Sequence, residues 1–133
     1  MSVVLITGGT GAIGTALVEE FSRTDDVAFT YFNNEERARE LSEKFHAFPV
    51  KMDISDKNSV QTAVESVLKE FSRIDVLVNN AGISLIKPFT DTTDEDWEKH
   101  LSVNLTGCFR VTKAVVPQMI RRKSGAVVTL SSV

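Results

Sequence analysis

Cysteine is nearly absent from this 133-residue chain, and so are long apolar runs and any excess of positive charge. The single cysteine, Cys108, excludes an internal disulfide and a thiolate metal cluster, so we expect a small buried helix residue there and no metal site. No apolar stretch approaches the length of a membrane span, and the N-terminus lacks a signal-peptide pattern. The net charge of −3 gives no general attraction to nucleic acid or anionic membranes. We therefore predict a cytoplasmic protein with neither kind of partner.

Patterns typical of strands alternate with patterns typical of helices along the chain, and the connections between them are short. The expected strands cover residues 3–6, 27–32, 48–52, 76–78 and 126–130. This alternation predicts an α/β fold, a doubly wound parallel sheet of the Rossmann type with strand order 3-2-1-4-5 and right-handed crossovers. We expect a single dinucleotide-binding domain over residues 1–133, incomplete at its C-terminus because such folds normally carry six or more strands.

Apolar residues at three- and four-residue spacing predict the buried faces of the helices. The expected faces contain Ile13, Leu17 and Phe21; Ala38, Leu41 and Phe45; Val60, Val64, Val67, Leu68 and Phe71; and, in a long region from 94 to 122, Trp97, Leu101, Leu105, Phe109, Val116 and Ile120. Asn33 with Glu36 and Thr92 with Glu95 have the spacing of helix caps. Pro117 is expected to bend the long helix or to fray its last turn.

The first fourteen residues change from a buried-strand pattern to a glycine cluster and then to helix-forming sequence. Gly9, Gly11 and Gly14 fit the pattern G-x-G-x-x-G, in which the glycines allow a tight turn and a close approach of the backbone to a diphosphate. The free N–H groups of the first helical turn would bind that diphosphate. A nucleotide triphosphatase loop would need Lys and then Ser or Thr next, whereas Thr15 and Ala16 follow. The alternative is a strand-to-helix turn that binds nothing.

Five short motifs occur in the order found in the short-chain dehydrogenases/reductases, and the chain resembles that family along its whole length. They are Thr7-Gly8 through Gly14, Asp53-Ile54, Asn79-Asn80-Ala81-Gly82, Asn104 within Val-Asn-Leu-Thr-Gly, and Ser131-Ser132. The chain looks most like the 3-oxoacyl-carrier-protein and acetoacetyl-CoA reductase branch. It departs from the usual T-G-x-x-x-G-x-G at Ala12, and its glycine spacing is shared with the extended, epimerase-like relatives. The Asn-Asn-Ala-Gly motif favours the short-chain group.

The resemblance implies a nucleotide cofactor site at the ends of the strands. It assigns the diphosphate to the glycine turn, and the adenosine to the tip of the second strand and two later segments; the implied residues are Thr7, Gly8, Gly9, Thr10, Gly11, Ile13 and Gly14, then Tyr31, Asn33 and Asn34, then Asp53, Ile54, Asn80, Ala81 and Gly82. In the family, the residue at Asp53 binds the adenine amino group, although this carboxylate could equally cap the following helix. The tip of the second strand carries no acid, which favours NADP over NAD.

For catalysis, the resemblance implies hydride transfer to the carbonyl carbon of a small molecule, such as a 3-oxoacyl thioester of fatty acid biosynthesis or a similar ketone. It implies that Asn104 anchors a water of a proton relay and that Ser132 donates a hydrogen bond to the carbonyl oxygen. His100, one helical turn before Asn104, is expected to be a solvated helix residue. Family members commonly form tetramers through the long helices, so we expect a homo-oligomer that assembles through residues 94–122.

The family's catalytic Tyr-x-x-x-Lys pair is expected beyond residue 133, about a dozen positions after the serine. The only tyrosine, Tyr31, is followed four places later by Glu35 and cannot replace that pair. We therefore expect the N-terminal part of a longer enzyme that is inactive by itself and binds its cofactor weakly, with the fifth strand left as an uncovered apolar edge. Two alternatives stay open: a non-catalytic dinucleotide sensor or scaffold, and an extended-type epimerase that acts on a nucleotide sugar.

Overall fold

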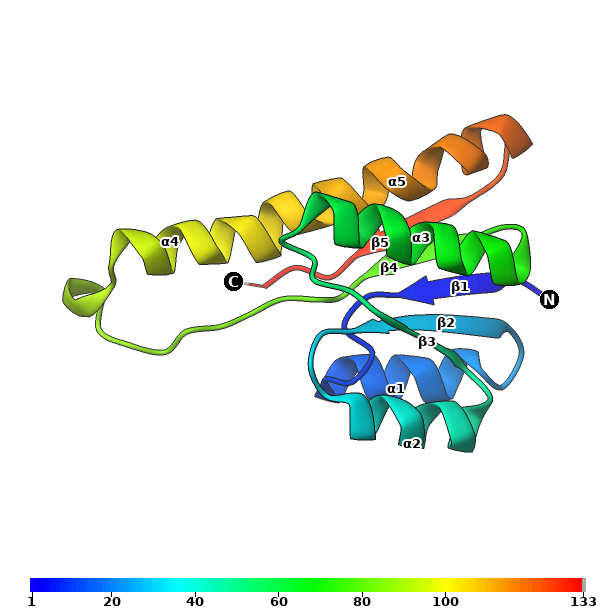
Figure 1. Ribbon diagram of the computed structural model, residues 1–133, viewed down its shortest axis with the longest axis horizontal. Helices are drawn as coiled ribbons and strands as arrows, with labels where there is room; N and C mark the ends of the chain where they lie inside the picture. The colour runs from blue at the N-terminus through cyan, green and yellow to red at the C-terminus, as the bar shows by residue number, and fades with distance from the viewer. Residues whose placement is uncertain (133) are drawn as a thin grey trace.

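A five-stranded parallel sheet forms the centre of the computed structural model, which describes residues 1–132 (Figure 1). Its strands lie in the order β3-β2-β1-β4-β5, and each neighbouring pair is parallel. They are β1 (Val3–Ile6), β2 (Asp26–Tyr31), β3 (Phe48–Lys51), β4 (Val76–Asn79) and β5 (Ala126–Thr129). The predicted doubly wound fold and its strand order are therefore confirmed.

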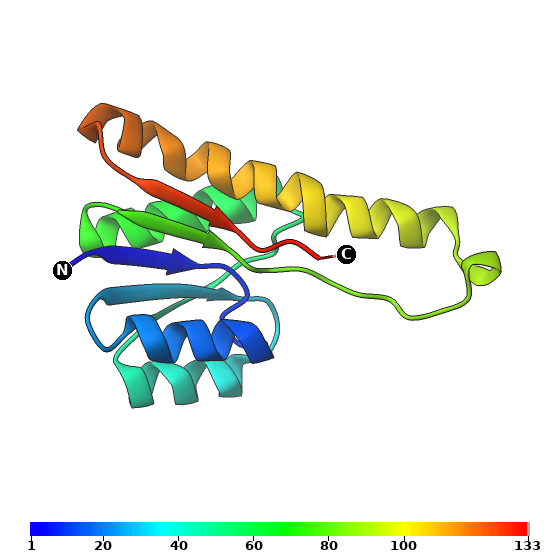
Figure 2. The same ribbon diagram turned by 180° about the vertical axis from the view of Figure 1, so that it is seen from behind.

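Helices cover both faces of the sheet. The helices are α1 (Ala12–Phe21), α2 (Glu35–Phe45), α3 (Lys57–Phe71), α4 (Asp94–His100) and α5 (Gly107–Arg122), with short helices η1 (Phe89–Asp91) and η2 (Leu101–Thr106). Figures 1 and 2 show α1 and α2 on one face and α3 and α5 on the other. The π-helix η2 joins α4 to α5, so that one long helix projects past the carboxyl edge of the sheet.

The two faces of the sheet bury separate apolar cores. Leu5 and Leu77 point into the core beneath α3 and α5, whereas Val4, Ile6 and Val78 point into the core beneath α1 and α2. Successive side chains of a strand point to opposite faces, so a strand covered on both sides must be apolar at every position. All four residues of β1 are buried for this reason.

Two predicted helix caps are wrong by one residue. Asn34, and not Asn33, caps α2, because its Oδ1 accepts a hydrogen bond from the Arg37 N–H at 3.2 Å. At α4 the capping box joins Thr93 to Asp96, and not Thr92 to Glu95. Both registers fit the cap pattern, but Thr92 already belongs to the preceding turn, where its N–H donates to the carbonyl of Phe89.

The predicted inner face of the long helix is also wrong. Trp97, Leu105 and Phe109 are 63%, 66% and 61% exposed, and the buried residues of α5 are Gly107, Val111, Val115, Gln118 and Met119. Four-residue spacing marks an apolar face but does not say whether anything covers it, and α4 lies beyond the end of the sheet (Figure 2). The helix also continues past Pro117 to Arg122. Every residue of β5 is exposed, as expected for an uncovered edge.

The helices give one further finding on membranes. Among the described residues, no helix combines the length and apolar character that crossing a bilayer requires.

Candidate functional site

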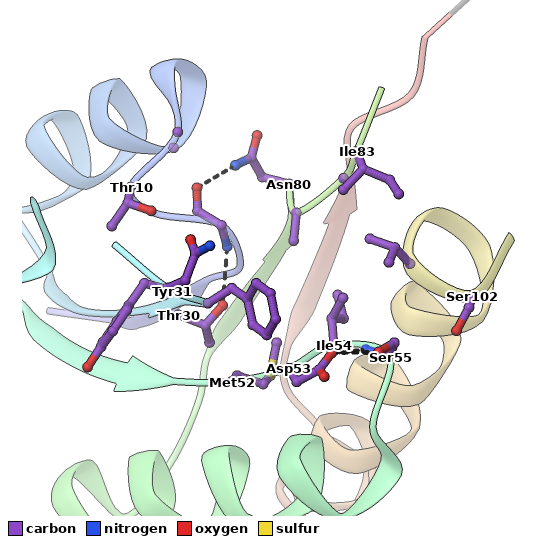
Figure 3. Close-up of a pocket in the computed structure, with 18 of the residues that line it drawn as sticks. Thr10, Thr30, Tyr31, Met52, Asp53, Ile54, Ser55, Asn80, Ile83 and Ser102 are labelled. Carbon is purple, nitrogen blue, oxygen red and sulfur yellow. Dashed lines mark hydrogen bonds between the residues drawn. The ribbon is translucent and has the colours of Figure 1, made fainter. Parts of the chain in front are cut away.

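A cleft of about 1010 Å³ opens at the carboxyl ends of the strands (Figure 3). The cleft lies between the turn that joins β1 to α1 and the projecting helix. At this point of the sheet β1 has β2 on one side and β4 on the other, so the order of the strands reverses. Ligands of doubly wound sheets bind at this switch point. Its lining includes segments that the sequence analysis brought forward, Gly8 and residues 10–14, 31–33, 53–54 and 80–82, together with side chains of α4 and η2 that it missed. The predicted Thr7 and Gly9 do not line it.

The glycine turn is shaped by contacts that leave no room for side chains. A Cβ on Gly14 would lie 2.0 Å from the carbonyl oxygen of Gly8, and a Cβ on Gly9 would lie 2.6 Å from the Phe29 ring. Gly8 itself adopts a φ of 69°, which favours glycine. Gly11 differs, because a Cβ there would meet only the Gly8 oxygen at an ordinary 3.6 Å. Gly14 therefore lets α1 begin directly against the turn.

Helix α1 is the exception among the α-helices that begin at a loop. Asn34, Asp56 and Thr93 each cap the first turn of α2, α3 or α4 with a side-chain oxygen, whereas Gly11 offers α1 none. The first-turn residues Ala12 to Gly14 line the cleft. Uncapped N–H groups at the positive end of a helix dipole form a site for an anion. The cleft therefore has the local structure that a diphosphate requires.

A hydrogen-bond network holds the turn in place between two strands. The buried Thr7 Oγ1 accepts hydrogen bonds from the N–H groups of Asn80 (3.0 Å) and Ala81 (2.9 Å). The Asn80 side chain donates to the carbonyls of Thr7 and Gly8, and the Gly8 N–H donates to Thr30 Oγ1 at 3.2 Å. Figure 3 shows Asn80 and Thr30 on opposite sides of the turn. The sequence analysis missed Thr30, although a buried polar residue within the apolar strand β2 was a usable signal.

The tip of β2 contributes part of the predicted set. Tyr31 and Asn33 line the cleft together with Phe32, which was not predicted. Asn34 does not line it, because its side chain caps α2. A phosphate donor is therefore available at Asn33 and not at both asparagines.

Asp53 lies at the cleft with its carboxylate held by a local turn. Its Oδ1 accepts from both the N–H (3.0 Å) and the hydroxyl (2.6 Å) of Ser55 (Figure 3). The possibility that Asp53 caps the next helix is wrong, because Asp56 caps α3 through the Ser59 N–H. The carboxylate is thus positioned beside Ile54 in the lining, and its role toward adenine stays a prediction.

Asn104 does not line the cleft but positions a residue that does. Its Oδ1 accepts from the Ile83 N–H at 2.7 Å and its Nδ2 donates to the Ile83 carbonyl at 2.9 Å. A Cβ on Gly82 would come within 3.2 Å of the same Oδ1. The amide thus fixes the backbone that follows the Asn80-Ala81-Gly82 segment, while the relay water remains a prediction.

The remaining predicted residues fall outside the lining. Ser132 lies past the end of β5 and is not part of the cleft lining, so its catalytic role stays a prediction. His100 is not the solvated residue that we expected: it is half-buried and both ring nitrogens form hydrogen bonds. Cys108 is only partly buried on α5.

Comparison with known proteins agrees with the geometry of this cleft. The model of the family described as short chain dehydrogenase matches residues 2–133. The chain is 36% identical to the protein named 3-oxoacyl-[acyl-carrier-protein] reductase FabG of Thermotoga maritima, over 98% of this chain and 55% of that protein. It is 38% identical to Oxidoreductase UcpA of Escherichia coli, over 97% of this chain and 51% of that protein.

Solved structures show the same architecture. The crystal structure of gox2181 superposes with a TM-score of 0.93 at 33% identity and covers 98% of this chain and 53% of that one. A short-chain dehydrogenase from Streptomyces avermitilis superposes with a TM-score of 0.91 at 32% identity, over 99% and 50% of the two chains. The chain spans about half the length of the curated relatives that it matches.

Proposed function

The chain belongs to the short-chain dehydrogenase family, and we propose that it supplies the nucleotide-binding half of an NAD(P)-dependent oxidoreductase that reduces a carbonyl compound to an alcohol. The relative named as a 3-oxoacyl-[acyl-carrier-protein] reductase supports a 3-oxoacyl thioester or a similar ketone as the substrate, and with it a place in fatty acid biosynthesis.

The observation that carries this proposal is the uncapped start of α1 in the cleft. Gly8, Gly9 and Gly14 pack so closely against Ala81, Phe29 and the Gly8 carbonyl that no side chain fits there, and this packing fixes the start of α1 where a dinucleotide diphosphate would bind. We assign the Asp53 carboxylate, which lines the cleft, to the adenine amino group. When bound, a nicotinamide dinucleotide exchanges a hydride with a carbonyl carbon. Asn104 holds the Ile83 backbone at the cleft, and Ser132 is proposed to donate to the substrate oxygen.

Giving α1 the cap that it lacks tests this proposal. Gly11 has an extended backbone (φ −73°, ψ 173°) and space for a Cβ, so Gly11→Asp supplies an ordinary N-cap and also places a carboxylate where the diphosphate would bind. We expect the chemical-shift changes of the Ala12 to Gly14 amides with millimolar NADP to disappear, while the melting temperature stays equal or rises. Gly11→Ala is the matched control and should keep the response. Unchanged nucleotide binding by the aspartate variant would contradict the proposal.

We also propose that the cofactor is NADP rather than NAD. The lining at the tip of β2 consists of Tyr31, Phe32 and Asn33, and none of these is the carboxylate that binds the ribose hydroxyls of NAD. Asn33 can donate to a 2′-phosphate. Comparison of the two dissociation constants on one preparation decides between them, and a tighter NAD complex would overturn the preference.

Residues 1–133 of the chain contain no Tyr-x-x-x-Lys pair, which the family resemblance implies as the source of the general acid for carbonyl reduction. Tyr31, its single tyrosine, lies at the tip of β2, at the end of the cleft assigned to adenosine. Because general acid catalysis contributes about 10²–10⁴ in rate, we propose that these residues alone turn over no substrate. Nucleotide oxidation with a ketone substrate above the buffer rate would contradict this.

We propose in addition that the protein is a homo-oligomer that assembles through the long helix. Trp97, Leu101, Leu105 and Phe109 recur every fourth residue and are all exposed, and they form an apolar stripe with the Lys113 ammonium over the Phe109 ring at its end. Large exposed apolar stripes mark interaction sites. Leu105→Glu should lower the mass that light scattering measures, whereas Arg121→Glu, at an exposed polar position of α5, should not.

A further inference from the structure

We propose that His100 is a pH-dependent positioning residue that fastens one rim of the cleft. The rim segment, residues 83–87, runs beside α4 and η2 in both views (Figures 1 and 2). Three helix side chains contact it in turn. Asn104 bonds to both backbone groups of Ile83, His100 accepts from the Leu85 N–H at 3.1 Å, and Asp96 forms an ion pair with Lys87.

The spacing of these contacts is matched on the two sides. Positions 96 and 100 are four residues apart in α4, a rise of about 6 Å, and position 104 follows four residues later in η2. Positions 87, 85 and 83 are two residues apart in the opposite direction, and an extended chain rises about 6.6 Å over two residues. Every second rim residue therefore meets the helix, while Ile86 between them is 97% exposed. The segment and the helix thus form a short antiparallel ladder with three rungs, which are the contacts of the helix with Ile83, Leu85 and Lys87.

The partners of His100 determine its protonation state. Its Nδ1 lies 2.8 Å from the Asp96 carbonyl oxygen, which can only accept, so Nδ1 carries the hydrogen. Its Nε2 faces the Leu85 N–H, which can only donate, so Nε2 carries none. The ring is therefore neutral with the proton on Nδ1. An imidazolium has two donors and no acceptor, so protonation would place an Nε2–H of His100 against the Leu85 N–H and break that hydrogen bond.

Of the three rungs, we expect only the middle one to respond to pH between 5 and 8. Asn104 does not titrate. The hydrogen bonds from Lys87 and from the Thr93 backbone lower the pKa of Asp96 to about 2, so the lowest rung keeps its charge. The other charged groups on the packed elements are Asp91 of η1 and Asp94, Glu95, Glu98 and Lys99 of α4, and η2 has none. Histidine is the side chain whose ordinary charge change falls in this range.

The three contacts between the helix and the rim segment, which we call the latch, affect the cleft because Ile83 and Gly82 line it directly. Loss of the hydrogen bond to Leu85, two residues from Ile83, would leave the rim segment held only by the contacts of Ile83 and Lys87. The consequence for ligand affinity rests on the proposed function, whereas the latch itself does not.

Nuclear magnetic resonance of the full chain without nucleotide tests the latch. At pH 8 we expect a proton on Nδ1 of His100 and a scalar coupling across the N–H···N bond from Leu85, and at pH 5.5 we expect that coupling to vanish. Protection of the Leu85 amide against exchange should fall about fivefold over the same range, as for loss of a hydrogen bond of ordinary strength. The Ile83 amide, held by Asn104, should keep its protection.

His100→Gln is the matched variant, because its amide oxygen can accept from Leu85 without titrating. Its Leu85 protection should not change between pH 8 and pH 5.5. A proton on Nε2 in the wild type, which needs no variant to observe, would overturn the proposal. So would equal pH dependence of Leu85 in the two proteins, or a Leu85 protection in the wild type that does not respond to pH. Failure of nucleotide binding would leave all these readouts unaffected, and so the two proposals fail separately.

Discussion

The two walls of the cleft are built by different means. On the side of α1 the wall is backbone packed on backbone, with Gly14 against the Gly8 carbonyl and Gly8 against Ala81. On the side of α4 the wall consists of side chains of α4 and η2 and of a loop that the side chains of Asn104, His100 and Asp96 hold. The first wall leaves no room for a side chain at Gly8 or Gly14, whereas the loop of the second is held by separate hydrogen bonds and one ion pair.

This difference indicates which parts of a ligand site must be rigid and which parts can adjust. A diphosphate requires several N–H groups at fixed positions, which the glycine turn supplies before any ligand arrives. The opposite wall is assembled from contacts that are each worth about 1 kcal/mol and are partly exposed. The predictions below test the two walls in order of decreasing effect.

The largest effect is expected from a single methyl group in the backbone wall. Gly14→Ala places a Cβ 2.0 Å from the Gly8 oxygen, so the turn or the helix must move, and we expect a loss of about 3 kcal/mol or more in the free energy of unfolding. Gly11→Ala, whose Cβ has only an ordinary 3.6 Å contact, should change it by less than about 1 kcal/mol. Urea unfolding of both variants measures this. Similar losses in the two would mean that the turn is not closely packed.

Asp75 lies at the amino ends of the strands and belongs to neither wall. Its substitution tests the stability of the sheet that carries both walls. Partial burial alone would raise its pKa, but hydrogen bonds from the Val3 N–H, Arg73 and Arg122 outweigh this and lower the pKa to about 2. The folded pKa is below the unfolded one, so this stability is present above pH 4 and is lost as the pH falls from about 4 to about 2.

Asp75→Asn should therefore cost roughly 2 kcal/mol at pH 7, at about 1.4 kcal/mol per pKa unit, and should make unfolding less dependent on pH below 4. Urea unfolding at pH 7 and pH 2.5 measures both effects. Glu70→Gln, at an exposed position of α3, is the control and should stay within about 0.5 kcal/mol of the wild type. If the two variants behaved alike, the hydrogen bonds to Asp75 would contribute nothing net.

A smaller effect is expected where the rigid wall meets the tip of β2. Asn33→Asp introduces the carboxylate that binds ribose hydroxyls and repels a 2′-phosphate. We expect the ratio of the NADP and NAD dissociation constants to move about tenfold toward NAD, equal to about 1.4 kcal/mol. Asn34→Asp should shift the ratio less, because its side chain caps α2 outside the lining. Calorimetric titration with both nucleotides reads the ratio, and an equal shift in the two variants would count against this placement.

The smallest effect is expected in the side-chain wall. Asn104→Ala removes both hydrogen bonds to Ile83 but leaves that backbone accessible to water, so the free energy of unfolding should fall by about 1 kcal/mol or less. Amide exchange at Ile83 should accelerate severalfold, while the Asn80 amide, held by Thr7, should keep its rate. Acceleration at both positions would show that the two walls are coupled.

The strands and most helices could be predicted because their patterns depend on local periodicity. The alternation of Leu5 with Val4 and Ile6 between the two cores is visible in the sequence once a covered parallel sheet is assumed. The glycine turn and Asp53 were also found from local spacing. Thr30 was missed although its polar side chain stands out in an apolar strand, whereas the α4 lining was missed because it reaches the cleft only through the crossing of elements distant in the chain. The apolar stripe from Trp97 to Phe109 was found but assigned to the wrong side, because periodicity reports a face and not its neighbour.

By itself, the sequence determined the order of strands and helices, the place of the turn and the absence of a side-chain cap on α1, because each of these depends on residues a few positions apart. Tertiary structure alone decided which oxygen each buried N–H would meet. Asn80 reaches Thr7 across 73 positions, and His100 meets Leu85 only because the rim segment folds back along α4. Hydrogen bonds need partners within about 3 Å, and for residues this far apart only the assembled sheet and helices bring the partners together.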